Sequence, residues 1–259
     1  MISSKNRKKF LLSLAGFDPT GEAGILRDVK VFYDLGFPGG GLPTSLTVQN
    51  SNVVFNTYPI DIQYIRRAAG RLEKDIYGIK TGMLYSVDMV DSVIHIIMSK
   101  KPKFLVVDPI IKSSSGYPFI GRRGLKALKN YLFPLATVIT PNFEEARELT
   151  GEKNINNILD TLREMGPKYI IVTGGESGDR DILYIGKDII ELKPGVKRKY
   201  SMHGSGCTHS AALLSFLCSG MDILDAAIHA KKYVEDKITI EGKREVKRKK
   251  TDTQKLFDF

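Results

Sequence analysis

The chain has 259 residues, of which 42% are hydrophobic, so it is long enough to bury one sizeable core. The formal net charge is +10, but most of the excess lies in residues 1–9 and 243–250, where solvated basic segments are the default interpretation. The basic residues are not interleaved with aromatic ones, which argues against specific nucleic-acid binding. The longest apolar runs are too short to cross a bilayer, and two cysteines cannot form a disulfide framework. We therefore expect a cytoplasmic protein with no membrane partner and no specific nucleic-acid partner.

Short apolar runs alternate with segments of helical periodicity along the chain. Strands are expected over residues 10–15, 39–49, 53–58, 76–83, 104–108, 136–140 and 169–173, with a hairpin of 183–185 and 189–192. Helices are expected over residues 25–35, 61–74, 87–99, 125–132, 143–149, 155–165, 206–218 and 222–238. This alternation is typical of a three-layer α/β/α domain with a mostly parallel central sheet. We assign residues 1–9 to a basic N-terminal segment, 10–240 to a single domain and 241–259 to a basic C-terminal tail.

The carboxyl ends of the strands are where such sheets bind their ligands. Four pieces of the chain fall there by their order: the loop 16–24, Asp108 at the end of an apolar run, the segment 142–145 and the turn 203–207. A polar, glycine-containing stretch at 112–119 is a candidate flap.

The sequence His-Gly-Ser-Gly-Cys at 203–207 is a glycine-rich turn that opens a predicted helix. The first turn of a helix leaves N–H groups unpaired and carries partial positive charge, so it can hold an anionic phosphate group. The same surroundings would favour the thiolate of Cys207. Two other interpretations are an ordinary tight turn and a metal site at His203 and Cys207, which lacks the further ligands that zinc needs.

Asn142 and Glu145 lie three residues apart at a predicted helix start, so their side chains can share one face. An amide oxygen and a carboxylate suit Mg²⁺, often through water. A helix cap followed by an acidic first turn favours the same residue types, and the two interpretations stand about even. An anion site, a magnesium pair and an acid at a strand end together favour phosphoryl transfer.

Several segments combine in a specific order: residues 15–24, 28–30, 46–50, 80–84, 107–109, 140–146, 174–175 and 203–212. In this order and spacing they resemble the hydroxymethylpyrimidine and hydroxymethylpyrimidine-phosphate kinases of thiamine synthesis, a branch of the ribokinase-like superfamily. The resemblance covers most of residues 10–235. It implies a ribokinase-like fold without a separate large lid domain, a homodimer, and Mg-ATP-dependent phosphorylation of 4-amino-5-hydroxymethyl-2-methylpyrimidine and its monophosphate.

The resemblance also implies roles for particular residues. Those matching the substrate site are Gly16, Asp28, Gln49 and Met83, and those matching the anion hole and catalytic position are Gly204, Ser205, Gly206 and Cys207. The positions matching nucleotide contacts are Asp108, Lys112, Asn142, Thr173 and Gly175, and the magnesium pair is Asn142 and Glu145.

Two positions depart from the family pattern. Ser114 and Thr173 stand where the family usually carries lysines, and Lys112 is a possible substitute two residues before the first. Lost positive charge there would weaken stabilisation of a phosphoryl-transfer transition state. Two alternatives therefore accompany the kinase prediction: a pyridoxal or pyridoxine kinase of the same fold, and a catalytically weak pyrimidine-binding relative.

Overall fold

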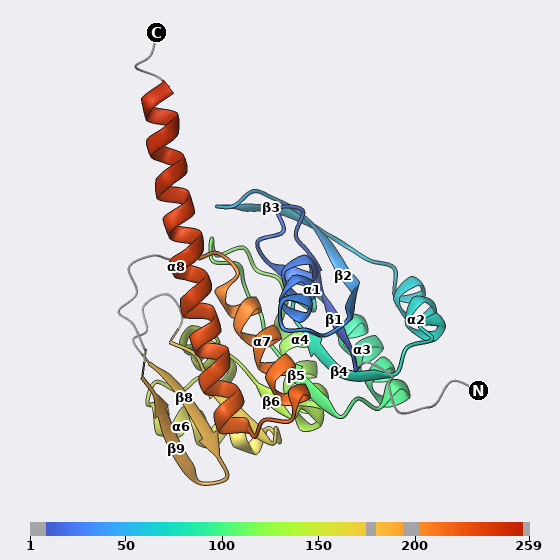
Figure 1. Cartoon of the computed structure of the whole chain (residues 1–259). Coiled ribbons are helices and arrows are strands. Elements are labelled where there is room, and N and C mark those ends of the chain that lie inside the picture. The colour runs from blue at the N-terminus through green and yellow to red at the C-terminus, as the bar shows by residue number, and fades with distance from the viewer. Residues whose placement is uncertain (1–8, 175–179, 194–201, 256–259) are drawn as a thin grey trace, which may run out of the picture.

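The computed structural model describes residues 9–174, 180–193 and 202–255, and for 243–255 it describes the backbone alone. These residues form one nine-stranded sheet with the strand order β3-β2-β1-β4-β5-β6-β7-β8-β9 (Figure 1). The strands are β1 Phe10–Phe17, β2 Gly39–Gln49, β3 Val54–Pro59, β4 Ile76–Thr81, β5 Phe104–Val107, β6 Val138–Ile139, β7 Tyr169–Val172, β8 Asp181–Ile185 and β9 Asp188–Leu192. The six strands from β2 to β7 in that order pair in parallel, and β3, β8 and β9 add antiparallel edges.

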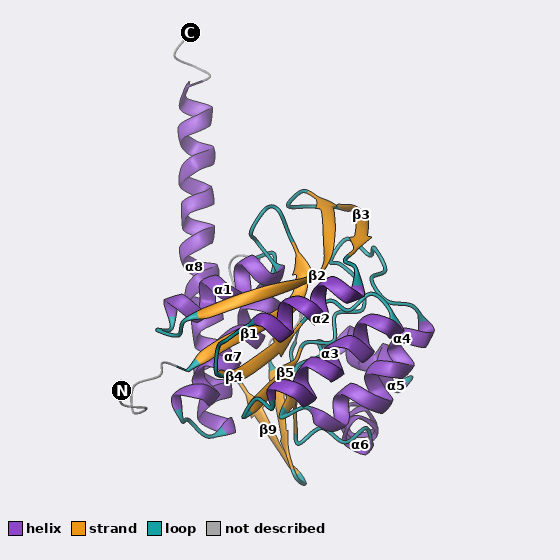
Figure 2. Ribbon diagram, turned by 90° about the vertical axis from the view of Figure 1, so that its right-hand side faces the viewer, coloured by secondary structure: helices purple, strands orange, loops and turns teal. Residues whose placement is uncertain are grey.

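Helices cover both faces of the sheet. They are α1 Gly24–Asp34, α2 Ile62–Arg71, α3 Val87–Lys100, α4 Arg122–Ala127, α5 Phe143–Thr150, α6 Ile155–Glu164, α7 Ser205–Ser219 and α8 Ile223–Lys255. Helices α2 to α6 pack on one face around one apolar cluster, and α1, α7 and α8 pack on the other around a second cluster (Figure 2). The predicted three-layer α/β/α architecture is confirmed, and the described residues contain no separate lid domain.

The central strands are continuous apolar runs because both of their faces are buried. Leu105 and Val107 of β5 enter the cluster beneath α2 to α6, whereas Val106 between them enters the cluster beneath α7 and α8. Because successive side chains of a strand point to opposite faces, each central strand contributes apolar side chains to both clusters. Polar residues that follow these strands emerge at their carboxyl ends, which places them at one edge of the sheet.

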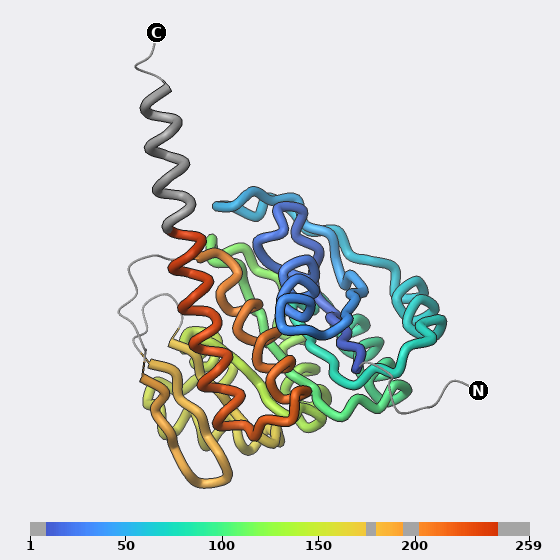
Figure 3. Tube along the Cα trace, in the orientation of Figure 1, coloured from blue at the N-terminus to red at the C-terminus, as the bar shows by residue number. Residues whose placement is uncertain are grey.

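Several elements differ from their predicted bounds. Residues 125–132 form the end of α4 followed by a π-helical turn at Leu128–Leu132, and the first hairpin strand begins two residues early at Asp181. The last helix was expected to end at 238, yet α8 continues to Lys255, so the predicted domain boundary at 240 falls inside a helix. The charged residues there are good helix formers, which explains why a run resembling a tail continues the helix. Helix α8 lies along α7 (Figure 3).

Within the described residues, no helix combines the length and the apolar character that crossing a membrane would require.

A buried charge cluster joins three elements beneath the sheet edge. The ammonium group of Lys80 in β4 donates to both carboxylate oxygens of Asp28 in α1 at 2.9 Å, and the hydroxyl of Ser13 in β1 donates to Oδ2 at 2.6 Å. All three side chains are fully buried. Burial alone would lower the pKa of Lys80, but the negative charges of Asp28 and its neighbours outweigh this effect and raise it. Lys80 is therefore a buried cation that depends on its carboxylate partner.

We expect Lys80→Met to lower the free energy of unfolding by about 3–5 kcal/mol, because it leaves the Asp28 carboxylate buried without a counter-charge. Urea denaturation measures this loss. The matched control is Arg66→Met, which removes the Arg66–Asp91 pair at the surface and one hydrogen bond to the Ser92 hydroxyl, and should cost only about 1–2 kcal/mol. The double variant Lys80→Met, Asp28→Asn should recover much of the loss. Equal effects of Lys80→Met and Arg66→Met would contradict this account.

Candidate active site

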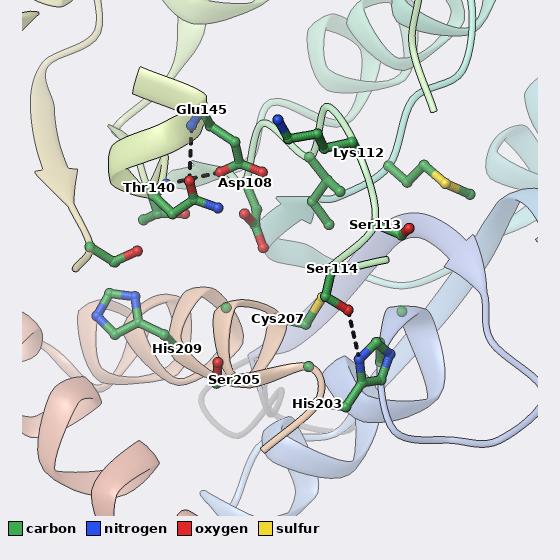
Figure 4. Close-up of a pocket in the computed structure, with 18 of the residues that line it drawn as sticks. Asp108, Lys112, Ser113, Ser114, Thr140, Glu145, His203, Ser205, Cys207 and His209 are labelled. Carbon is green, nitrogen blue, oxygen red and sulfur yellow. Dashed lines mark hydrogen bonds between the residues drawn. The ribbon is translucent and has the colours of Figure 1, made fainter. Parts of the chain in front are cut away.

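A cavity of about 540 Å³ opens at the carboxyl ends of the parallel strands. Asp108, Thr140 and Thr173 reach it from the ends of β5, β6 and β7. The loop after β1, the flap segment and the start of α7 supply the other walls. Figure 4 shows the side chains of Asp108, Glu145 and Cys207 directed toward the same space. The four pieces expected at the strand ends therefore meet in one cavity.

The loop 16–24 is closed by hydrogen bonds to a single carboxylate. Asp18 accepts from the Thr20 N–H and hydroxyl at 2.8 Å and from the Ala23 N–H at 2.8 Å. Gly24 has φ +60°, and a Cβ there would lie 2.2 Å from the Gly16 carbonyl oxygen. A larger residue at 24 would force the two ends of the loop apart. These contacts fix the conformation of the loop, which forms one wall of the cavity.

The turn before α7 packs its backbone against that wall. Gly204 has φ +73°, and a Cβ there would lie 2.0 Å from the carbonyl oxygen of Glu22. The N–H and hydroxyl of Thr208 both donate to the Gly204 carbonyl at 2.9 Å, which starts the helix. A Cβ at Gly206 would meet nothing within 4 Å, so open space rather than packing borders this residue. The first amides of α7 can therefore face an anion in the cavity.

Cys207 lies at the base of this turn and is only 6% exposed. Burial raises the pKa of its thiol to about 12, although the nearby Lys80 ammonium and a hydrogen bond from the Gly24 N–H oppose that rise. The sequence favours the thiolate at this helix start, whereas the pKa shift runs in the other direction. The helix effect is outweighed because the sulfur has been removed from water and lies near the negative charges of Asp108 and Asp28. At neutral pH the resting side chain is a thiol.

Asp28 does not reach the cavity. It is absent from the cavity lining, is fully buried, and its carboxylate is committed to Lys80 and Ser13. The expected contact between Asp28 and a pyrimidine is therefore corrected: this carboxylate lies below the floor. Gly16, Gln49 and Met83 do line the cavity, as the family resemblance implies.

The floor beside the turn is held by Asp108, which accepts from the Ser210 hydroxyl at 2.9 Å and lies 3.7 Å from the Lys80 ammonium group. Because Lys80 also pairs with Asp28, one buried ammonium group partly neutralises two carboxylates. The family resemblance includes the segment 80–84 but implies no role for Lys80 itself. Its burial became visible only in the fold.

Asn142 and Glu145 form the helix cap and also line the cavity. The Asn142 N–H donates to Glu145 Oε2, and the Glu145 N–H donates to Asn142 Oδ1, both at 2.9 Å. Burial raises the pKa of Glu145 to about 8, with a further contribution from the charge of Asp108. The hydroxyl of Thr140 beside them is buried without a hydrogen-bond partner among the described residues. Thus the cap interpretation is realised, and the Thr140 hydroxyl lies beside this cap with no partner among the described residues.

The described residues contain no cluster of three or more His, Cys, Asp or Glu side chains that could hold a metal ion. A Mg²⁺ ion bound largely through water and substrate phosphates needs fewer protein ligands.

The flap segment touches two other walls of the cavity. The Ser114 hydroxyl lies 3.5 Å from Nδ1 of His203, and the Val54 N–H donates to Ser115 Oγ at 3.5 Å. Lys112 also lines the cavity, and its exposed ammonium group lies 3.8 Å from Glu148. The flap therefore approaches both β3 and the turn before α7.

The end of the cavity next to β7 contains groups that the sequence analysis did not identify. Lys231 of α8 donates to Asp181 Oδ2 at 2.9 Å, and the Gly174 N–H donates to Asp181 Oδ1 at 2.9 Å. These residues line the cavity together with Thr173 and His209. No local motif marks them, because they come together only when α8 packs beside the hairpin. Gly175, a predicted nucleotide contact, lies outside the described residues.

Comparison with known proteins supports the family resemblance that the sequence motifs indicate. The phosphomethylpyrimidine kinase family model matches residues 18–253. A hydroxymethylpyrimidine/phosphomethylpyrimidine kinase of Staphylococcus aureus strain MRSA252 is 34% identical over 244 residues, which cover 88% of this chain and 87% of that protein.

Solved structures agree. The phosphomethylpyrimidine kinase of Clostridium difficile 630 matches with a TM-score of 0.76 and 32% identity over 89% of this chain and all of its own. The pyridoxal kinase of Staphylococcus aureus in complex with AMP-PCP and pyridoxal matches with a TM-score of 0.76 and 27% identity, over 89% and 88% of the two chains. The fold, the cavity at the strand ends and these matches lead to one conclusion: this chain belongs to the phosphomethylpyrimidine kinase family.

Proposed function

We propose that this chain transfers the γ-phosphoryl group of ATP first to 4-amino-5-hydroxymethyl-2-methylpyrimidine and then to the resulting monophosphate. The observation that carries the proposal is the meeting, in one cavity, of the glycine turn before α7 with the Gly16, Gln49 and Met83 walls. The relatives named hydroxymethylpyrimidine/phosphomethylpyrimidine kinase supply the substrate class. The relative in complex with AMP-PCP supports ATP as the phosphoryl donor.

The substrate end of the cavity suits a small aromatic ring. Gln49 offers an amide that can both donate to and accept from a ring nitrogen or amino group. A Cβ at Gly16 would lie 2.5 Å from Cε of Met83, so the glycine lets the methionine form the apolar wall. Both Gln49 and the Gly16–Met83 wall are uncharged, so neither distinguishes a pyrimidine substrate from pyridoxal by an electrostatic interaction.

The phosphate end depends on positioning and charge. The amides at the start of α7 would face the transferred phosphoryl group. Asn142 and Glu145, with the Thr140 hydroxyl beside them, would hold Mg²⁺ directly or through water. When bound, that ion supplies neutralisation of the phosphate charge. Thr173 and Lys112 also line the cavity and would border the nucleotide phosphates, without the usual family lysine at either Ser114 or Thr173.

Cys207 would act on the proton of the acceptor. The hydroxymethyl group loses a proton as its oxygen bonds to phosphorus, and the thiolate sulfur can take it. The monophosphate oxygen is already anionic near neutral pH, so the second step needs little proton transfer. Because the pKa of Cys207 is about 12, the thiolate is a minor form that grows as pH rises.

The direct test is ADP release with the pyrimidine alcohol, its monophosphate and pyridoxal as separate acceptors. We expect turnover with both pyrimidines and a smaller kcat/KM for pyridoxal. A larger kcat/KM for pyridoxal would favour a pyridoxal kinase, whose solved structures match this chain with TM-scores of 0.76 and 0.80, against 0.76 for the phosphomethylpyrimidine kinase. Pyrimidine binding by calorimetry without ADP release would instead identify a catalytically weak relative.

We expect Cys207→Ala to slow the first phosphorylation about 10²-fold and the second by less than about threefold, because only the first acceptor must lose a proton. In the unmodified protein the first step should accelerate from pH 7 to pH 9, and Cys207→Ala should abolish that rise. The second step serves as the internal control in the same protein. Equal losses in both steps, with no change in pH dependence, would remove Cys207 from proton transfer.

We also propose that a second copy of this chain covers the outer face of β2 and β3. Thr47 and Gln49 of β2 line the cavity, whereas Leu46 and Val48 alternate with them and point away from it. Leu46 and Val48 are apolar and exposed, as are Phe55 and Tyr58 of β3, and Tyr58 pairs with Leu46 across the two strands. Sedimentation velocity measures the assembly, and a monomer at micromolar concentration would refute the dimer.

We further propose a cytoplasmic location. Cys207 and Cys218 are both free thiols, which suits a reducing compartment. Cell fractionation with an antibody against the chain tests this assignment.

A further inference from the structure

Helix α8 is attached to α1 at two points of different character. Near the end of α1, Asp34 accepts from the Lys237 ammonium group at 2.7 Å and from the Tyr233 hydroxyl at 3.1 Å, in an exposed setting. Near the start of α1, Arg27 donates to Oε1 of Glu241 at 2.8 Å and to Oε2 at 3.4 Å. The Arg27 side chain is only 7% exposed. The Glu241 side chain is 33% exposed, so the second attachment is a two-pronged ion pair between a buried arginine and a partly buried glutamate.

Arg27 makes a third contact that points toward the cavity. Its Nε donates to the carbonyl oxygen of Glu22 at 3.0 Å. This is the carbonyl oxygen against which Gly204 packs, and the Ala23 Cα also lies 3.2 Å from the position of a Gly204 Cβ. One guanidinium group thus connects Glu241 of α8 with the backbone that supports the glycine turn.

The connection matters because the turn has no side chain of its own at Gly204 to hold it in place. The carbonyl of Glu22 packs against it, and the Glu22–Ala23 peptide is held from two directions: Arg27 donates to its carbonyl oxygen, and Asp18 accepts from its N–H. The planar guanidinium fork is held on its other side by Glu241, which limits its rotation. A small displacement of a phosphoryl-binding backbone costs rate, because transfer requires close alignment of the reacting atoms.

We propose that Glu241 is a positioning residue for phosphoryl transfer, acting through Arg27 on the turn at Gly204. This inference rests on the proposed kinase function and deepens it. It gives the part of α8 beyond the predicted domain boundary a role in the reaction, although Glu241 touches neither substrate.

The first test is steady-state kinetics of Glu241→Gln, which keeps the side-chain size and removes the charge facing Arg27. We expect kcat to fall roughly threefold to tenfold while KM for the pyrimidine stays unchanged, because the substrate walls are not involved. Arg27→Gln should lose at least as much. The double variant should lose no more than Arg27→Gln alone, since both changes break one connection. Additive losses, or a changed KM with an unchanged kcat, would overturn the proposal.

The matched control is Asp34→Asn, which breaks the other attachment between the same two helices. We expect its kcat to equal that of the unmodified protein, although this change also removes an ion pair between α1 and α8. Equal losses of kcat in the two variants would mean that general docking of α8 is what matters, and would refute a specific role for Glu241.

A binding measurement separates this inference from the kinase assignment. Calorimetry with AMP-PCP and with ADP compares nucleotides with and without the terminal phosphate. Glu241→Gln should weaken AMP-PCP binding roughly threefold to tenfold and leave ADP binding unchanged, because only the terminal phosphate would contact the turn. This result would stand even if no pyrimidine were turned over. An equal effect on both nucleotides would overturn the inference without touching the proposed function.

Discussion

The site depends on one close backbone contact, the packing of Gly204 against the carbonyl of Glu22. This contact joins the loop after β1 to the start of α7, two pieces separated by most of the chain. It requires a positive φ and leaves no room for a Cβ, so only glycine satisfies both conditions. The substrate walls at Gly16 and the phosphate-binding amides of α7 therefore hold fixed relative positions. An active site built on two distant segments needs such a joint, because loops alone would not keep them aligned.

Beneath this joint, a single buried ammonium group balances several negative groups. Lys80 pairs with Asp28 and lies close to Asp108, and its positive charge also favours ionisation of Cys207. Two carboxylates and one cation leave this floor without spare positive charge, so the thiol stays protonated in the resting protein. The same balance that stabilises the fold thus limits the fraction of Cys207 thiolate that is present for catalysis. Cys207 therefore suits a substrate hydroxyl group that becomes acidic as its oxygen bonds to phosphorus, because the proton then leaves more readily.

The convergence of the loop 16–24, Asp108, the 142–145 segment and the 203–207 turn could be predicted because parallel strands end at one edge of the sheet. Local patterns were enough for that prediction. They could not place Asp28, because its partner Lys80 is 52 residues away and the choice between solvent and core depends on that pairing. The thiol of Cys207 was misjudged for a related reason, since its desolvation depends on tertiary packing. The charged end of α8 resembled a tail because the Arg27–Glu241 pair cannot be seen in one helix alone.

The most direct test of the central claim is ADP formation by Gly204→Ala beside Gly186→Ala. Both glycines have positive φ, +73° and +64°, but only a Cβ at 204 meets backbone atoms, whereas one at 186 meets nothing within 4 Å. In samples shown by circular dichroism to be folded, the account predicts a loss of more than about 10²-fold in kcat for Gly204→Ala. It predicts little change for Gly186→Ala, in the β8–β9 turn. Retention of turnover by folded Gly204→Ala, at the level of Gly186→Ala, would contradict the claim that this joint positions the transferred phosphoryl group.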